Sequence, residues 1–246
     1  MVTSDTATVS PTTPTTAPQL TTRSDHRSLT VVLLAALSML PALATLWLII
    51  SLGRPQPYWD EWQWVSLLIT QAQTGLSLTD LTAQHNESRM VFPRLVMLLW
   101  TALLGQWDSR PGMVLSWALT LAAALLIRSL SVRTMNLSAG ASWALLLPVN
   151  CVLFGWFQSE TWTVGFQFVQ VIPFTALLLA LWVLTTSAGI VTTVALLAIV
   201  VVFTVYSFAS GVLMWVALFP ALWALRDRQL LSKKWLIALW WGWLCW

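Results

Sequence analysis

The chain has 246 residues, of which 58% are hydrophobic and 9% are charged, and it carries 18 tryptophans and a net charge of +3. A soluble domain carries about 25% charged residues, so this composition excludes a water-soluble globular domain, a disordered chain and a disulfide scaffold. Nucleic-acid binding needs clustered basic residues, which the weak and scattered positive charge does not supply. Long continuous apolar runs predict an all-α membrane protein, a polytopic helical bundle of about six to eight transmembrane helices.

Residues 1–28 form a polar segment rich in threonine and proline, and this composition predicts a disordered tail. A transmembrane domain is expected over residues 29–246. Its first apolar run, residues 29–52, is long enough to cross a bilayer of about 30 Å. The last apolar run is still apolar at Trp246, so we expect the chain to be the N-terminal part of a longer protein or a truncated one.

A polar segment of about residues 53–110 follows the first run and is expected to be a large outer loop that contains surface helices. Further apolar runs cover residues 91–104, 111–127, 142–157, 164–186, 190–208 and 212–225, and a last one opens at Trp235. The run 91–104 is the shortest and begins with Pro93-Arg94, which suit a membrane core poorly. We therefore expect it to lie in or re-enter the outer leaflet, which gives six complete spans and a seventh that is cut.

The basic residues predict which side of the membrane each loop occupies. Lysine and arginine are enriched in cytoplasmic loops, and the candidate cytoplasmic groups are Arg23 with Arg27, Arg128 with Arg133, and the cluster of residues 226–234. All three lie on one side only if residues 91–104 do not cross. The N-terminus is then cytoplasmic. If residues 91–104 do cross, the cluster at 226–234 falls outside, which the positive-inside bias disfavours.

The outer loop opens with two adjacent acids between tryptophans, in Trp59-Asp60-Glu61-Trp62. Apolar residues then recur at helical spacing, which predicts a short helix on the membrane surface with its N-terminus at Asp60 and Glu61. Acids at this place complement the helix dipole, and a carboxylate held at the headgroup level also suits a general base. The sequence leaves both roles open.

A second polar motif, His85-Asn86-Glu87-Ser88-Arg89, stands later in the same loop and is followed by Pro93-Arg94. The spacing Ser77-x-x-Asp80 before it predicts a capped helix start. The motif offers an imidazole, an amide, a second carboxylate and a guanidinium fork for phosphate, although a solvated turn has the same composition. The next outer loop carries Gln158 and Glu160, a further acid at a membrane boundary.

These features together resemble the GT-C fold of integral-membrane glycosyltransferases, over roughly residues 29–225. The resemblance rests on a first span followed at once by an acidic outer-loop motif, then a surface helix, a polar motif, a proline-containing helix and a second-loop acid. More narrowly, His85-Asn86-Glu87-x-Arg89 with Phe92-Pro93-Arg94 is similar to a bacterial set of such proteins.

The resemblance implies a function and a role for each motif. A sugar would pass from a lipid-linked donor, a polyprenyl phosphate, to a glycan, lipid or protein acceptor at the outer face of a bacterial plasma membrane. Asp60 would be the catalytic base, with Glu61 as the second choice. The remaining roles are second carboxylates or acceptor-orienting groups (Glu87, Glu160, Gln158), phosphate or substrate binding (His85, Asn86, Arg89, Arg94), and a divalent cation at Asp60, Glu160 and His85.

Two other classes of protein stay open at this point. A transporter would place ionisable groups inside its spans near the bilayer midplane, whereas the acids here lie at or outside span boundaries. A non-catalytic membrane assembly protein needs no site, and its outer polar residues would be scattered rather than convergent.

Overall fold

The computed structural model describes residues 22–218, apart from the side chains of residues 22–27 and 190, and in this range it contains helices and turns but no β-strand. Five long helices form the body of the molecule: α1 (Thr22–Leu52), α5 (Arg110–Met135), α6 (Ala139–Leu153), α8 (Phe168–Leu184) and α9 (Ile190–Val205). The connecting helices are α2 (Glu61–Thr74), α3 (Leu78–Thr82), α4 (Val91–Leu104) and α7 (Ser159–Thr163), with single 3-10 turns η1 (Trp156–Gln158), η2 (Gly165–Gln167) and η3 (Ala209–Val212).

Three of these segments are long and apolar enough to cross a membrane, namely Ser28–Leu52, Arg110–Met135 and Gly165–Leu184. A fourth crossing is available if Ala139–Leu153 and Trp156–Thr163, which meet at 44°, form one broken span. Helix α9 and the segments Val91–Leu104 and Ala209–Leu218 are shorter. The described residues thus supply three or four candidate spans of the six to eight expected, and the run that opens at Trp235 lies outside them.

Helix α1 begins at Thr22, inside the segment that the composition predicted to be disordered up to Ser28. The tail was predicted from its composition, rich in threonine and proline, and the helix takes in residues 22–28 of it. The apolar part alone, Ser28–Leu52, is the portion suited to lipid. The rest of the predicted tail, residues 1–21, lies outside the described residues.

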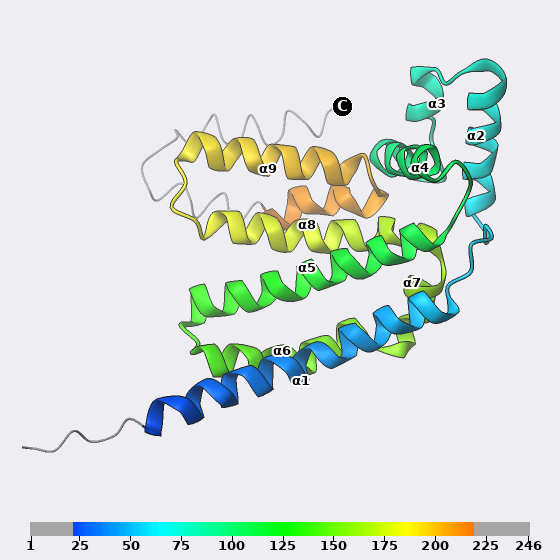
Figure 1. Ribbon diagram of the computed structural model, residues 1–246. Helices are drawn as coiled ribbons and strands as arrows, with labels where there is room; N and C mark the ends of the chain where they lie inside the picture. Colours follow the sequence, from blue (N-terminus) through cyan, green and yellow to red (C-terminus); the bar gives the residue numbers. More distant parts are fainter. Residues whose placement is uncertain (1–21, 219–246) are drawn as a thin grey trace, which may run out of the picture.

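The long helices lie side by side, and their connections alternate between two ends of the bundle (Figure 1). The most extensive contacts are those of α5 with α8 and of α1 with α6. Helices α2, α3 and α4 gather at one end, and we call these three helices the cap (Figure 1). Helix α4 runs across that end instead of along the bundle, which is the orientation expected of a helix that does not cross with the others.

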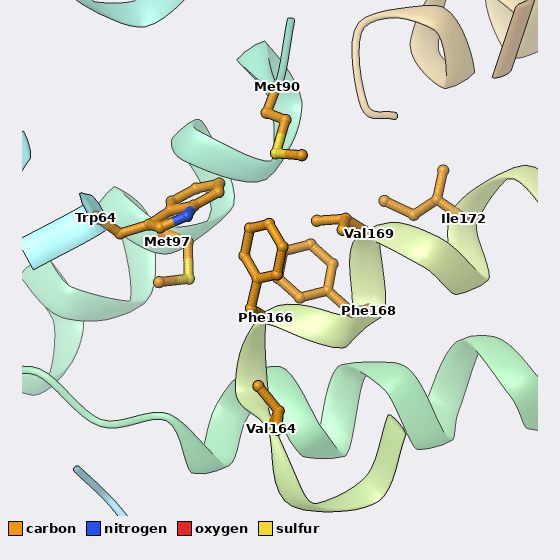
Figure 2. Close-up of a cluster of buried hydrophobic side chains, with 8 residues drawn as sticks. All are labelled: Trp64, Met90, Met97, Val164, Phe166, Phe168, Val169 and Ile172. Atoms are coloured by element: carbon orange, nitrogen blue, oxygen red, sulfur yellow. The ribbon is translucent and has the colours of Figure 1, made fainter. Parts of the chain in front are cut away.

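A cluster of buried apolar side chains holds the cap against the bundle (Figure 2). Trp64 of α2 meets Phe166 of η2 edge to face at 5.4 Å between ring centroids, and Trp100 of α4 meets Phe168 of α8 in the same way at 5.7 Å. Aromatic pairs favour this geometry and bury large apolar areas. The cap is therefore packed on η2 and the first turn of α8, which sets the position of the outer-loop polar groups.

Side-chain hydrogen bonds to backbone carbonyls tie the long helices together. Asn150 Nδ2 of α6 donates to the Ser38 carbonyl of α1 at 2.7 Å, Trp117 Nε1 of α5 to that of Ala42 at 2.8 Å, and Thr175 Oγ1 of α8 to that of Leu119 at 3.1 Å. Inside a bilayer, burying apolar surface between helices gains little free energy, because the lipid tails are apolar as well. Hydrogen bonds of this kind and close packing are then what hold helices together.

The closest backbone approach joins α5 to η2. A Cβ on Gly112 would lie 2.0 Å from the carbonyl oxygen of Gly165, and a Cβ on Gly165 would lie 2.2 Å from that of Ser109. These neighbours are backbone atoms that cannot swing aside. Glycine is therefore required at both positions, and the start of α5 and the η2 turn are held in direct contact.

We expect Gly112→Ala to lower the free energy of unfolding by about 2 kcal/mol or more, because overpacking of a tight contact costs about 1–3 kcal/mol. Thermal unfolding followed by tryptophan fluorescence in lipid nanodiscs measures the effect. Gly140→Ala in α6 is the matched control, since its new methyl group would meet only side-chain atoms at 3.8–4.0 Å. Equal unfolding midpoints for the two variants would contradict the close contact.

Candidate functional site

The two adjacent acids at the start of α2 have opposite surroundings. The side chain of Asp60 is half exposed, at 50%, whereas Glu61 is 1% exposed. Trp59, directly before them, has φ of 48°, a left-handed conformation that costs free energy for a bulky residue. Its ring stacks on that of Tyr58 at 5.1 Å. This turn sends Asp60 outward and Glu61 into the protein.

Glu61 joins three segments that are distant in the sequence. Its Oε2 accepts hydrogen bonds from the Tyr58 backbone N–H at 2.8 Å and from Ser109 Oγ at 2.9 Å. The backbone amides of Gly165 and Phe166 also favour its ionised form, although neither makes a well-formed hydrogen bond to Oε1. Burial outweighs these donors and raises the pKa of Glu61 above its ordinary value of 4.5.

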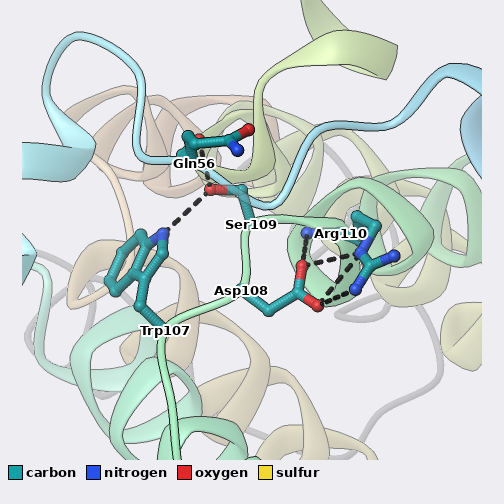
Figure 3. A network of polar contacts seen from close by, with 5 residues as sticks. All are labelled: Gln56, Trp107, Asp108, Ser109 and Arg110. Carbon is teal, nitrogen blue, oxygen red and sulfur yellow. Dashed lines mark hydrogen bonds and ion pairs between the residues drawn. The ribbon is translucent and has the colours of Figure 1, made fainter.

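The hydroxyl of Ser109 decides how this network is satisfied. Its oxygen accepts from Trp107 Nε1 at 3.1 Å and lies 3.1 Å from the Gln56 carbonyl (Figure 3). Ser109 has one proton, so with an ionised Glu61 it donates either to the carboxylate or to Gln56. A protonated Glu61 can donate to Ser109, which is then free to donate to Gln56. With a protonated Glu61, one more polar group of this network has a hydrogen-bond partner than with an ionised Glu61.

An ion pair between Asp108 and Arg110 lies at the start of α5, and it was not predicted from the sequence. The Asp108 carboxylate accepts from Arg110 Nε at 3.0 Å and from the Arg110 backbone N–H at 2.9 Å (Figure 3). The hydrogen bond from the guanidinium lowers the pKa of Asp108. The only sequence signal for this pair is an acid two residues before an arginine at a helix start. The pair lies at the N-terminus of α5.

Asp60 instead approaches the second polar motif. Its Oδ2 lies 3.8 Å from Nε2 of His85, whose side chain is 5% exposed. That nitrogen has no hydrogen-bond partner among the described residues, and the imidazole ring packs against Phe166 at 5.8 Å. The structure thus brings together two candidate residues from the two polar motifs of the outer loop, one half exposed and one buried.

The motif that carries His85 is a tight turn. The backbone N–H of His85 donates to the Ser88 carbonyl at 2.8 Å and that of Ser88 to the His85 carbonyl at 2.9 Å. Asn86 occupies the left-handed region, with φ of 51°, which asparagine tolerates. His85 and Ser88 are buried, while Asn86, Glu87 and Arg89 are exposed.

Ser88, which the sequence did not single out, links this turn to a distant loop. Its hydroxyl accepts a hydrogen bond from the backbone N–H of Ala209 in η3 at 2.9 Å. The Phe92 backbone N–H donates in the same region to the Tyr206 carbonyl at 3.3 Å. The first and third connections at this end of the bundle are therefore joined directly.

Arg94 has structural partners. Its Nη1 donates to the carbonyls of Leu81 at 2.7 Å and Ala83 at 2.6 Å, which ties α4 to the end of α3. The predicted capped start of α3 is confirmed, since Ser77 and Asp80 exchange side-chain and backbone hydrogen bonds in a capping box. Part of the guanidinium proposed for phosphate is thus committed to holding the cap.

A cleft of about 300 Å³ opens between α2 and the segments that carry α3 and α4. His85 and Arg94 line it together with Asp80, Gln63 and Gln84, and Trp64 and Leu67 add apolar wall. The Asp60–His85 pair therefore adjoins a concave, mostly polar surface. Its lining is more polar than that of most small-molecule sites, which are mainly apolar with a few placed polar groups.

The second-loop candidates lie at the same end of the bundle but apart from this pair. Gln158 Nε2 donates to the Val152 carbonyl at 3.1 Å, and Glu160 is exposed on α7, which packs against α5 and α1. Within residues 22–218 no hydrogen bond or ion pair joins Glu160 to Asp60 or His85, and no group of three or more His, Cys, Asp or Glu side chains is placed to hold a metal ion. The divalent-cation set expected from Asp60, His85 and Glu160 is therefore not assembled here.

Comparisons of this chain with known protein families, with curated proteins and with solved structures give no match. What can be said of its function therefore follows from its own geometry.

The raised pKa of Glu61 predicts a pH-dependent stability. The folded state holds the proton more tightly than the unfolded chain, so this group stabilises the fold at low pH, and the contribution is lost as pH rises from about 4.5 through the raised folded pKa. Unfolding midpoints across pH, compared with those of Glu61→Gln, isolate this effect. The control is Glu87→Gln, the same change at an exposed glutamate. If the stability of the unchanged protein relative to Glu61→Gln stays constant or rises with pH, the raised pKa of Glu61 is contradicted.

Proposed function

We propose that this protein is a membrane glycosyltransferase of the GT-C type, which transfers a sugar from a lipid-phosphate donor to an acceptor at the outer end of its helical bundle. The observation that carries the proposal is the half-exposed Asp60 carboxylate, 3.8 Å from an unpartnered buried His85 nitrogen at the edge of a polar cleft. The proposal includes six to eight transmembrane spans, a location in a bacterial plasma membrane and a cytoplasmic N-terminus.

The location of the pair supports this reaction class. A lipid-phosphate sugar presents its anomeric carbon in the headgroup plane, so the chemistry must take place where the loops meet the membrane surface. The cap, α7 and η3 all lie at one end of the bundle (Figure 1). Ser88 and Ala209 connect two of these segments directly, so the turn that carries His85 is joined to η3 at the proposed membrane face.

The surroundings of the two acids support different roles for them in this proposal. Asp60 is the general base, which takes the proton of the acceptor hydroxyl as that oxygen bonds to the anomeric carbon and the carbon–phosphate oxygen bond breaks. Glu61 is a positioning residue, because its carboxylate is buried and bonded to Tyr58 and Ser109. Its removal would act through the placement of α2.

His85 and the arginines complete the proposed site. The buried imidazole of His85 lies beside Asp60 and is the group that orients this carboxylate toward the acceptor. Arg89 is exposed on the same turn and is the guanidinium available to the leaving phosphate, where positive charge stabilises the transition state. Arg94 holds the cap together through the carbonyls of Leu81 and Ala83.

Asp60→Asn is expected to reduce sugar transfer by about 10²–10⁴-fold, the usual contribution of a general base. The measurement is release of polyprenyl phosphate from polyprenyl-phosphate sugars by the membrane-reconstituted protein. Asp25→Asn, the same change near the start of α1 at the opposite end of the bundle, serves as the control. Full activity of Asp60→Asn, with an unchanged unfolding midpoint, would reject Asp60 as the base.

The proposed topology predicts that residues 60 and 160 face the same compartment. Single cysteines at Asp60, Glu160 and Arg133, in a chain without Cys151 and Cys245, are labelled in intact cells with a membrane-impermeant maleimide. We expect labelling at positions 60 and 160 and protection at 133, which lies at the other end of α5. Protection at only one of the two outer positions would overturn the topology and the shared site.

A further inference from the structure

The cleft between α2 and the α3–α4 segment is lined by charged groups that are already compensated. The Asp80 carboxylate accepts from the Ser77 backbone N–H at 2.8 Å and from the Ser77 hydroxyl at 2.6 Å. The guanidinium of Arg94 donates to two backbone carbonyls and is also attracted by Asp80. Asp80 and Arg94 thus each have partners within the protein, and their opposite charges offset each other in the cleft.

The groups that remain available are neutral. Gln63 and Ser66 project from α2 into the cleft lining, and their side chains make no hydrogen bond to other described residues. His85 adds a nitrogen that is buried and without a partner, although a buried polar atom of this kind is normally hydrogen-bonded. A ligand that both donates and accepts hydrogen bonds would satisfy all three.

The dimensions restrict the ligand further. A volume of about 300 Å³ is at the lower end of the range of about 300–1,000 Å³ for small-molecule sites. Trp64 and Leu67 provide apolar surface beside the amide and hydroxyl groups. One ring of a sugar, with hydroxyls around its edge and C–H groups on its face, matches both this size and this mixture.

We propose that the cleft binds a single neutral, hydroxyl-rich ring, a monosaccharide unit of the donor or the acceptor, and that the donor phosphate lies outside it. The inference rests on the proposed function for the choice of sugars as ligands. It adds that Gln63, Ser66 and His85 contact the sugar hydroxyls. Because His85 also adjoins Asp60, a ring held in the cleft lies next to the catalytic carboxylate.

Binding can be observed at His85 itself. The chain has two histidines, His26 and His85, so the His26→Gln protein labelled with ¹⁵N-histidine reports on the cleft alone. The probes are methyl glycosides of hexoses and pentoses, the corresponding sugar 1-phosphates, and inorganic phosphate, each titrated into the protein in nanodiscs. We expect saturable shifts of the imidazole signals with at least one methyl glycoside and none with inorganic phosphate.

The lining makes a matched pair of variants possible. Gln63→Leu should weaken glycoside binding about 10-fold, since one hydrogen bond to a ligand is worth about 1.4 kcal/mol at that ratio. Gln73→Leu, the same change on an exposed position of α2 outside the cleft, should leave it unchanged. Ser66→Trp, which fills the cleft, should abolish the shifts.

Any of these outcomes would overturn the inference: shifts with inorganic phosphate, no shift with any sugar probe, or equal effects of Gln63→Leu and Gln73→Leu. Stronger binding of a sugar 1-phosphate than of its methyl glycoside would also do so, because the cleft would then recognise charge. Binding needs no turnover, so it can be scored in Asp60→Asn. Glycoside binding without any transfer by the unchanged protein would leave this inference in place and remove the proposed reaction.

Discussion

The buried carboxylate of Glu61 determines where the outer polar groups lie. One oxygen binds the turn before α2 and the hydroxyl of Ser109 at the start of α5, and the Gly165 backbone packs close to the other. A buried acid of this kind is unfavourable unless it is well bonded. Its partners come from three separate segments, so the interaction forms only when the cap, α5 and η2 are in place together. The position of Asp60 follows, because it directly precedes Glu61 at the start of the same helix.

The polar motifs near Glu61 differ in what their side chains contact. The motif at residues 85–89 buries an imidazole next to Asp60 and exposes an acid and an arginine. Arg94 holds α4 against the end of α3, Asp80 caps the start of α3, and their opposite charges offset each other in the cleft. The arrangement separates groups that maintain the cap from groups that face outward, and the proposed chemistry uses only the second set.

The amino-acid sequence predicts local features well and distant partners poorly. The helix that starts after Asp60, the capping box at Ser77 and the short helix 91–104 follow from spacing and turn chemistry, and the structure has all three. The burial of Glu61 could not be predicted from the sequence, because its partner Ser109 is 48 residues away. In addition, nothing in the local sequence distinguishes Glu61 from the adjacent acid Asp60. Arg94 was expected to bind phosphate, and its carbonyl partners become evident only when the end of α3 is located.

The hydrogen bond between Ser88 and Ala209 spans 121 residues of the chain, and this separation has a consequence for biogenesis. The ribosome synthesises the 85–88 turn well before the segment that closes it, and domains take shape as the chain emerges. Helices α5, α6, α8 and α9 all lie between these two residues in the sequence, so all four are synthesised before the bond can form. Until Ala209 has been synthesised, the 85–88 turn lacks this hydrogen bond, and the cap is incomplete.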